Sequence, residues 1–433
     1  MPKKIVVVGM GYVGIPVAVA FSMAGFNVIG INRSRKKVDQ INKGISPIGG
    51  REPSLAPLLK KMVKARRLRA SQDFKECVGA QAIIVAVQTP FNEEEERPDY
   101  SSLESAMNDI GANLSQGTIV VVESTISPGT IEGVVKPILE SKSGLVAGEG
   151  FYLGTCPERV RPGRLLKNLI ELDRVVGGYG EKSTKKMLSL YRFIVKGNLY
   201  GVDCLTAEVV KTVENAYRDA QIAFANEVAM ICEALGVDVY KVRELVNKSP
   251  YRNMHMPGAG VGGHCLPKDS LLLAYSVAGK YKPMMLKVAR DINDTMPLHL
   301  VNLVESSLSE IKMPIRGARI AILGLAYVGN SDDTRNTPAG PILKELEKMG
   351  AEVRVQDPYV KMFQGKKVSR RLREVLKGAD CLVIVTDHDS YRKIGLKSIK
   401  NLMRTPIIID GRNIFKKERC LREGLIYHGI GNL

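Results

Sequence analysis

A glycine-rich stretch between residues 258 and 269 carries the side chains best suited to covalent chemistry. Four glycines within positions 258–263 are followed by Cys265, Lys268 and Asp269. Glycine lets a backbone turn tightly and lie close to a bound molecule, and a thiol near an amine and a carboxylate can act as a nucleophile. Because a lone cysteine is more often a small buried hydrophobe, an inert Cys265 and a reactive Cys265 both remain open at this point.

A second set of polar side chains recurs along one predicted helix. Residues 206–235 are rich in alanine and free of glycine and proline, with Thr206 as the predicted cap and Gly236 as the stop. Four polar residues follow one another there at steps of three or four: Glu208, Lys211, Asn215 and Asp219. That spacing places them on one helix face. Since the other faces are mainly apolar, we expect a helix buried all round, with the polar line facing a site.

The first residues of the chain predict an element that binds a dinucleotide. Residues 4–8 read as a buried strand, residues 15–24 read as a helix, and Gly9, Gly11 and Gly14 lie between them in G-x-G-x-x-G spacing. In this context the pyrophosphate lies at the helix N-terminus, and Gly11 allows its close approach.

The next predicted strands continue this unit. Residues 27–31 form a strand that ends in Asn32 and Arg33 where an acidic residue would bind a free ribose, so NADP stays open beside NAD. Strands over 82–87 and 118–123 end in polar turns that we expect to border the nicotinamide. The acidic residues 93–96 between them read as a solvated loop.

Residues 319–329 repeat the pattern of residues 4–14 without a gap and predict a second nucleotide-binding type of unit. Ala326 stands where Gly11 stands, and its methyl group obstructs a pyrophosphate, so the second unit should hold a different ligand or hold one differently. Further strands are expected over 351–355, 381–386 and 407–410. Asp387-His388-Asp389, after one of these strands, reads as a polar loop rather than a metal site.

The remaining segments complete the predicted frame. A loop over 156–163 is followed by a strand over 173–178 that closes the first unit, and helices are expected over 238–246 and 286–310, with a kink or break at Pro297. We therefore predict an α/β fold in which two Rossmann-like, doubly wound parallel-sheet domains are joined by a long central helix and a helical middle region. The predicted domains cover 1–200, 201–310 and 311–433.

Composition narrows the classes of partner. Lys and Arg outnumber Asp and Glu by 63 to 45 over 433 residues, giving a net charge of +18. The basic residues are dispersed, without an Arg/Gly/aromatic tract, which favours anionic small molecules over nucleic acid. No apolar run could span a membrane and no signal-peptide core precedes the first strand, so a cytoplasmic protein is expected. Seven scattered cysteines without a C-x-x-C pair predict reduced thiols and no metal site.

A dinucleotide beside a cysteine has a specific chemical use. Alcohol dehydrogenation needs only a hydride acceptor and a base, whereas oxidation of an aldehyde needs a tetrahedral hydride donor, which a thiolate creates by adding to the carbonyl. Loss of hydride then gives a thioester, and water releases an acid. The alternative is a two-electron dehydrogenase of the hydroxyacid or sugar-phosphate type, in which Cys265 is structural.

A set of motifs in fixed order resembles the UDP-sugar 6-dehydrogenase family over nearly the whole chain. The motifs are Gly9-x-Gly11-x-x-Gly14, Ser124-Thr125 to Pro128-Gly129-Thr130, Pro157-Glu158-Arg159, Ala207-Glu208-x-x-Lys211-x-x-x-Asn215, Phe224-x-Asn226-Glu227, Gly262-Gly263-His264-Cys265-x-Pro267-Lys268-Asp269, Asp332-Asp333-Thr334-Arg335, Asp357-Pro358 and Asp410-Gly411-Arg412-Asn413. Arg159 and His264 resemble the branch acting on UDP-N-acetylmannosamine or UDP-N-acetylglucosamine. UDP-glucose remains the alternative substrate.

The resemblance implies a four-electron oxidation of the 6-hydroxyl of a UDP-sugar, with two NAD consumed, by a homodimer paired through the long helix. The implied catalytic residues are Cys265 as nucleophile, with Lys211, Asp269, Asn215, Glu158 and Thr125. The implied cofactor contacts are Gly9, Gly11, Tyr12, Val13, Gly14, Asn32, Arg33, Lys37, Thr89, Pro90, Thr125, Lys268 and Arg335. The implied substrate contacts are Glu158, Arg159, Val160, Lys211, Asn215, Tyr251, Arg252, Gly262, His264, Tyr327 and Arg412, with Arg252 reaching across the dimer.

Two positions depart from the family pattern. Asn32 replaces the family's Asp after the second strand, which leaves the preference between NAD and NADP open. Val328 replaces a frequent Lys after the aromatic residue of the second glycine turn, and Arg335 is the candidate to supply the missing substrate contact.

Overall fold

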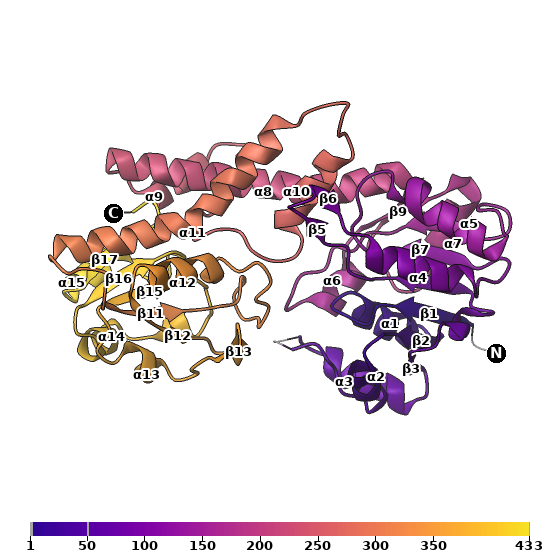
Figure 1. The fold of residues 1–433 in the computed structure, drawn as a ribbon, viewed down its shortest axis with the longest axis horizontal. Helices are drawn as coiled ribbons and strands as arrows, with labels where there is room; N and C mark the ends of the chain where they lie inside the picture. The colour runs from indigo at the N-terminus through magenta and orange to yellow at the C-terminus, as the bar shows by residue number, and fades with distance from the viewer. Residues whose placement is uncertain (1–2, 50–51, 433) are drawn as a thin grey trace. The chain divides into compact units, whose positions relative to one another are not determined.

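The computed structural model describes residues 3–49 and 52–432, which fold into two compact units (Figure 1). The first unit comprises the chain up to residue 214 together with 271–282, and the second comprises 215–270 and 283–433. Helices α8 (Cys204–Leu235) and α10 (Leu266–Tyr275) each contribute to both units. The division of the chain into three domains at residues 200 and 310 stays a prediction.

The first unit is built on an eight-stranded sheet in the order β10-β9-β8-β7-β4-β1-β2-β3. Neighbouring strands are parallel except for β8 and β9, which are antiparallel. The strands are β1 (Lys4–Val8), β2 (Asn27–Ile31), β3 (Leu68–Ser71), β4 (Ala82–Val85), β7 (Ile119–Val122), β8 (Tyr152–Thr155), β9 (Arg174–Gly178) and β10 (Leu199–Asp203). The prediction that the strand over 173–178 closes this unit was wrong, because β10 pairs outside it.

Helices cover both faces of this sheet. Ile5 and Val7 of β1 pack into one core cluster, whereas Val6 and Val8 pack into another, so alternate side chains of the strand point to opposite buried layers. The helices are α1 (Gly14–Met23), α2 (Arg35–Asn42), α3 (Leu55–Lys64), α4 (Ser101–Gly111), α5 (Lys136–Ser143), α6 (Leu165–Glu171) and α7 (Gly180–Tyr191), with a 3₁₀ turn at Phe74–Cys77 and a π turn at Ile131–Val135. The doubly wound architecture is confirmed. A hairpin of β5 (Phe91–Asn92) and β6 (Arg97–Pro98) carries the exposed acidic loop 93–96.

The second unit contains a five-stranded parallel sheet in the order β12-β11-β15-β16-β17. Its elements are β11 (Arg319–Leu323), α12 (Ala339–Lys348), β12 (Glu352–Gln356), α13 (Leu372–Leu376), β15 (Cys381–Ile384), α14 (Leu396–Leu402), β16 (Ile407–Asp410), α15 (Lys417–Arg422) and β17 (Ile426–Gly429), with a 3₁₀ turn at Tyr391–Lys393, and α9 (Val239–Val246) precedes them. Gly324 N donates to Gln356 O as Gly9 N donates to Ile31 O, each at 2.9 Å, so the alignment of the two glycine turns is confirmed.

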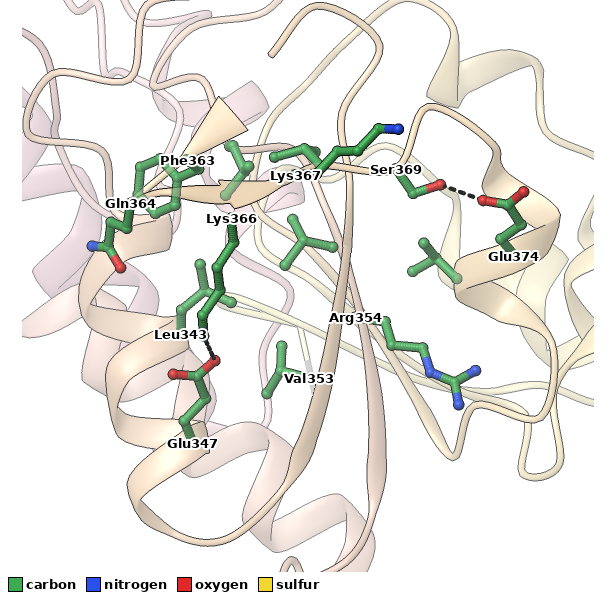
Figure 2. A pocket seen from close by; sticks show the side chains of 14 residues that line it. Leu343, Glu347, Val353, Arg354, Phe363, Gln364, Lys366, Lys367, Ser369 and Glu374 are labelled. Carbon is green, nitrogen blue, oxygen red and sulfur yellow. Dashed lines mark hydrogen bonds and ion pairs between the residues drawn. The ribbon is translucent and has the colours of Figure 1, made fainter. Parts of the chain in front are cut away.

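The two units differ at the outer edge of the sheet. In the first, β3 extends the sheet beyond β2, whereas in the second a short hairpin of β13 (Met362–Phe363) and β14 (Lys366–Lys367) lies beside the edge strand β12. A cavity of about 340 Å³ opens between this hairpin, β12 and α12 (Figure 2). Leu343, Val353 and Phe363 line it, and an ion pair between Lys366 and Glu347 crosses its rim at 3.0 Å. Among the described residues, none of those predicted for the site lines this cavity.

Helix α8 begins earlier than expected and is capped differently. The Asp203 carboxylate accepts hydrogen bonds from the backbone N–H of Thr206 at 2.8 Å and from its hydroxyl at 2.6 Å, so Asp203 rather than Thr206 caps the helix. The prediction that α8 is buried all round was also wrong. Its polar line is largely buried, but Tyr217 is 64% exposed and Phe224 is 57% exposed on another face.

The long helix after the glycine-rich loop is continuous. Helix α11 (Met284–Glu310) passes through Pro297, where a break was one of two expected outcomes. Buried side chains along α11 join the core that also contains Ile320 and Ile322 of β11. This helix therefore provides a rigid wall for the second unit.

Candidate functional site

The first glycine turn leaves space where a dinucleotide would lie. A Cβ atom on Gly14 would lie 1.9 Å from Gly9 O, so the protein itself requires that glycine. At Gly11, by contrast, a Cβ atom would meet no atom of residues 3–49 and 52–432 within 4 Å. No side chain caps the N-terminus of α1, and no acidic residue lies in its first turn. The turn therefore fits a pyrophosphate, whose charge the helix N-terminus stabilises.

The loops after β2, β4 and β7 surround this turn at the carboxyl ends of the strands. Asn32 Oδ1 accepts a hydrogen bond from Ser34 N at 2.9 Å, while Arg33 and Lys37 are exposed. Thr89 donates its hydroxyl proton to Thr125 O at 2.6 Å, and both threonines are buried. The structure thus brings together the two strand-end turns that were predicted to border the nicotinamide, with Pro90 exposed beside them.

The second glycine turn is filled by a side chain of the protein. The Asp357 carboxylate accepts hydrogen bonds from Leu325 N at 2.7 Å and from Ala326 N at 3.3 Å, at the positions that correspond to Met10 and Gly11. His388 Nε2 lies 3.2 Å from the same carboxylate. Burial alone would raise the pKa of Asp357, but its hydrogen bonds outweigh that effect and lower it. The turn therefore already binds an anion, which agrees with a different role for this unit.

The loop 387–389 is tied to the same feature. His388 is fully buried, and its Nδ1 accepts a hydrogen bond from Asn330 N at 2.9 Å. This leaves the other ring nitrogen to donate to Asp357. The interpretation of Asp387-His388-Asp389 as a polar loop fits these bonds, and no group of three metal-ligating side chains occurs among the described residues.

In the first unit, Lys211 is held by the loop that follows β8. Its ammonium donates to Glu158 O at 2.6 Å and lies 3.6 Å from Glu158 Oε1, and both residues are buried. Glu158 also accepts a hydrogen bond from Val160 N. The neighbouring Arg159 forms an ion pair with Glu214 and donates to Asp173 O at 2.7 Å. The loop thus fixes the Lys211 ammonium beside the Glu158 carboxylate.

Glu208, one turn before Lys211 on α8, organises the loop after β7. Its carboxylate accepts hydrogen bonds from Gly129 N at 2.7 Å and Ile131 N at 2.8 Å. Burial raises the pKa of Glu208 to about 7, although the two backbone hydrogen bonds oppose the shift. Sequence reasoning placed Glu208 on the polar line and in a family motif but gave it no role.

In the second unit, Cys265 lies at the start of α10. Its carbonyl accepts the first helical bonds, from Lys268 N at 3.1 Å and Asp269 N at 2.9 Å. The unpaired N–H groups of a helix N-terminus favour negative charge nearby. The fully buried Asp269 accepts a hydrogen bond from Asn215 Nδ2 at 2.5 Å, and Lys268 Nζ lies 3.6 Å from its other oxygen. The structure therefore brings together Asn215, Lys268 and Asp269, beside the turn that carries Cys265.

The seven cysteines are free, and they differ in exposure. Six are buried, and burial raises the pKa of Cys77 and Cys156 to about 12, which keeps these thiols protonated at neutral pH. Cys265 is partly exposed. Exposure is the property that a nucleophilic thiol needs and that a structural thiol lacks.

The glycines before Cys265 pack against the protein. A Cβ atom on Gly262 would lie 2.5 Å from Asn336 O, and one on Gly263 would lie 2.8 Å from the Tyr327 ring. Gly263 also has a φ of +94°. These contacts show that protein atoms already require Gly262 and Gly263, and their close approach to a bound molecule stays a prediction. The two glycines let the loop close over the turn after β11.

Some of the residues predicted to bind the substrate are held by other side chains or backbone groups, and others project into solvent. Arg412 donates from Nε to Val385 O at 2.7 Å, and burial lowers the pKa of its guanidinium. Arg335 pairs with Asp333 at 2.5 Å, and His264 is partly buried. Tyr251 and Arg252 project into solvent from the loop after α9, with Tyr251 fully exposed at a φ of +62°. Arg412 and Arg335 are thus held by other residues of the second unit, whereas Tyr251 and Arg252 lie on its surface.

The comparison with protein families assigns each part of the chain to a known type of domain. Three domain models of the UDP-glucose/GDP-mannose dehydrogenase family match in order: the NAD binding domain over 3–195, the central domain over 205–295 and the UDP binding domain over 321–417. The chain belongs to this family. The turn with Gly11 therefore lies in its NAD binding domain, and the turn filled by Asp357 lies in its UDP binding domain.

Members of this family are similar to the chain over its full length. A UDP-N-acetyl-D-mannosamine dehydrogenase from Pyrococcus horikoshii is 40% identical over 99% of each chain. The solved structure of a UDP-D-ManNAc dehydrogenase from Pyrococcus horikoshii matches with a TM-score of 0.93 at 39% identity and covers 99% of each chain. An NDP-N-acetyl-D-galactosaminuronic acid dehydrogenase from Methanosarcina mazei Go1 matches with a TM-score of 0.86 at 41% identity, covering 99% of this chain and 95% of that one. None of the helices in the described ranges is both long and apolar enough to pass through a bilayer.

Proposed function

We propose that the chain oxidises the 6-hydroxyl of UDP-N-acetyl-D-mannosamine to a carboxylate, with two NAD reduced per sugar. The observation that carries the proposal is the full-length identity of 40% to a UDP-N-acetyl-D-mannosamine dehydrogenase. Membership of the family supplies the NAD dependence and the UDP-binding domain. The partial exposure of Cys265 supports the acid as product, because a second oxidation needs a thiol.

The two groups of side chains support complementary roles in this reaction. NAD, when bound, supplies the hydride acceptor for each oxidation. Asp269, with Lys268 and Asn215 at its two oxygens, would hold the water or hydroxyl that gives up a proton. Lys211 would stabilise the oxyanion that forms at C6, and Asn215 would assist it. Because Lys211 is fixed by Glu158, its charge needs no reorganisation during the reaction.

Cys265 would act after the first oxidation. Its thiolate would add to the C6 aldehyde, and loss of the second hydride would convert the resulting thiohemiacetal into a thioester. Water, activated near Glu158, would then cleave the C–S bond, which releases the acid and restores the thiol. Thr125 would lie near the reacting carbon at the nicotinamide end of the cofactor.

The second unit would bind the rest of the substrate. We assign Arg412, Tyr327, Gly262 and His264 to its contacts, since Gly262 packs against Tyr327 and Gly258 lies next to Arg412. Because the amides of the turn after β11 already bind Asp357, the substrate phosphates would depend on Arg412 and Arg335 instead.

We also infer a homodimer formed through α8. Six large apolar side chains of this helix are more than 40% exposed: Leu205, Val213, Tyr217, Phe224, Ile231 and Leu235. Such a strip on a long helix fits a second copy of the same helix. Light scattering on Phe224→Glu tests this assignment, since a dimer through α8 should become a monomer.

A panel of UDP-sugars tests the proposed reaction. We expect the highest kcat/KM with UDP-N-acetyl-D-mannosamine and two NADH per sugar consumed. A second candidate substrate is a nucleotide-linked N-acetyl-D-galactosamine, because the relative from Methanosarcina mazei Go1 that is named an NDP-N-acetyl-D-galactosaminuronic acid dehydrogenase is 41% identical. A single NADH per sugar, with an aldehyde as product, would instead indicate a two-electron dehydrogenase.

A further inference from the structure

A buried charged cluster lies in the first unit, next to the loops that carry two of the predicted catalytic residues, Thr125 and Glu158. Glu123 directly follows β7, and Arg174 is the first residue of β9. The two form an ion pair of 3.3 Å, and each side chain is at most 1% exposed. Tyr191 donates its hydroxyl proton to the other Glu123 oxygen at 2.6 Å, and the Arg174 guanidinium lies 5.2 Å from the centre of the Tyr191 ring.

Fold stability does not explain this cluster. Removing two charges from water carries a large desolvation cost, and a hydrophobic pair of similar volume is often as stable or more stable. Within the described part of the protein, Arg174 Nε and Nη1 are buried without a hydrogen-bond partner. The ion pair therefore carries a desolvation free energy that a Leu–Met pair would avoid. We infer that its role is to hold the backbone segments that its two partners contact.

That geometry joins two loops. Arg174 Nη2 donates to Cys156 O at 2.7 Å, and Cys156 lies two residues before Glu158. Glu123 lies two residues before Thr125, at the start of the loop after β7. One guanidinium thus contacts Cys156, the first residue of one loop, and Glu123, the residue directly before the other. The carbonyl of Glu158 in turn accepts a hydrogen bond from the Lys211 ammonium at 2.6 Å.

We propose that Arg174 is a positioning residue, which together with Glu123 fixes the spacing of the loops 124–130 and 156–163 and thereby the place of the Lys211 ammonium. This inference rests on the proposed function. The contacts of Arg174 with Cys156 and Glu123 reach the reaction only through the loops that these residues precede or begin, and above all through Glu158. A misplacement of about 1 Å in a catalytic group can lower a rate about 100-fold.

The test compares three variants with the wild type. Arg174→Met removes the guanidinium, Arg174→Lys keeps a charge with fewer donors, and the double variant Glu123→Leu/Arg174→Met replaces the pair by two apolar side chains. Arg404→Met is the control, because it also breaks an ion pair with a buried carboxylate, that of Asp380. Asp380 precedes β15 and thus lies at the amino end of that strand, whereas the functional loops follow the carboxyl ends of strands. For each protein we would measure kcat, KM for both substrates, the dissociation constant of NAD and the unfolding temperature.

We expect kcat of Arg174→Met to fall about 100-fold, with KM and NAD affinity changed less than about threefold. Arg174→Lys should recover about tenfold of that loss, since it can still donate one hydrogen bond. Arg404→Met should lower the unfolding temperature, but it should not lower kcat selectively relative to KM. The double variant keeps the inference testable if Arg174→Met does not fold, because it buries no unpaired charge. A folded double variant with near wild-type kcat would overturn the inference.

Failure of the proposed function would give a different result. If the wild type oxidises none of the UDP-sugars, the reaction is misassigned, and hydrogen exchange then decides the positioning role. Faster exchange of amides in 124–130 and 156–163 of the double variant, with unchanged exchange in β1 and β4, would support it. Unchanged exchange in both loops would refute it.

Discussion

The carboxyl group of Glu208 should make the stability of the protein fall as pH rises through neutrality. Its pKa is about 7 in the folded protein because it is buried, against an ordinary value of 4.5. The folded state therefore holds a proton that the unfolded state releases between these two values. Since the native state binds more protons in this window, the free energy of unfolding decreases with pH.

The size of the effect follows from the two pKa values. Between pH 5 and pH 8 the linkage relation gives a loss of about 2.5 kcal/mol from this one group. In Glu208→Gln the loss should disappear, because the amide does not titrate. Its single oxygen can accept from only one of Gly129 N and Ile131 N, so the variant should be less stable at every pH, but with a flatter dependence on pH. Glu132→Gln is the matched control, since Glu132 lies next to the same turn but is exposed.

Urea unfolding at pH 5, 6, 7 and 8 measures the difference directly. We expect Glu132→Gln to keep most of the wild-type pH dependence, because the charge of Glu132 raises the pKa of Glu208 less than burial does. The curve of Glu208→Gln should be flatter by about 2.5 kcal/mol over the range. Parallel curves for wild type and Glu208→Gln would show that Glu208 is ionised throughout, and would refute the argument from burial.

Three further outcomes follow from the two nucleotide turns and the thiol. Cys265→Ser should lower the formation of acid by about 1,000-fold or more while NAD still binds, because a hydroxyl is a far weaker nucleophile, and acid formed at the wild-type rate would contradict the covalent role. Gly11→Ala should keep the unfolding temperature, since its Cβ atom meets no protein atom, yet weaken NAD binding at least about tenfold, whereas Gly14→Ala should be destabilised by contact with Gly9 O. Asn32→Asp should raise the preference for NAD over NADP about tenfold in kcat/KM, and an unchanged ratio would show that Asn32 does not face the ribose.

Local patterns predicted the sheets well. Strands β1, β2 and β16 begin or end where the apolar runs do, and the second glycine turn has the pairing that the repeat implied. Strand β10 was missed because Gly201 interrupts its short apolar sequence, Leu199–Asp203, and the strand is largely exposed, as an edge strand can be. The exposed face of α8 was missed for the opposite reason. Its apolar side chains predicted burial, and a sequence does not state which apolar surface is buried within one chain.

The site was predicted in its residue types and only partly in its bonds. The spacing of Lys211 and Asn215 indicated one helix face, and both carry the bonds expected of a site. The packing of Gly262 and Gly263 against Tyr327 was not predicted, because glycine spacing shows that something lies close but not that it is a side chain of the protein. The ion pair of Arg174 and Glu123 could not be predicted from a local sequence pattern, because 51 positions (174 − 123) separate the two residues in the chain.

The Asp357 carboxylate in the second glycine turn has a consequence for duplicated folds. Two copies of a nucleotide-binding unit in one chain would ordinarily compete for the same cofactor, because both present backbone amides at the end of a first strand. Here the second copy satisfies its amides at Leu325 and Ala326 with its own carboxylate, held in place by His388. An internal anion of this kind makes two homologous halves chemically distinct without any change of fold. One dinucleotide should therefore bind per chain at saturation, and Asp357→Asn is the substitution with which a second, weaker site could emerge.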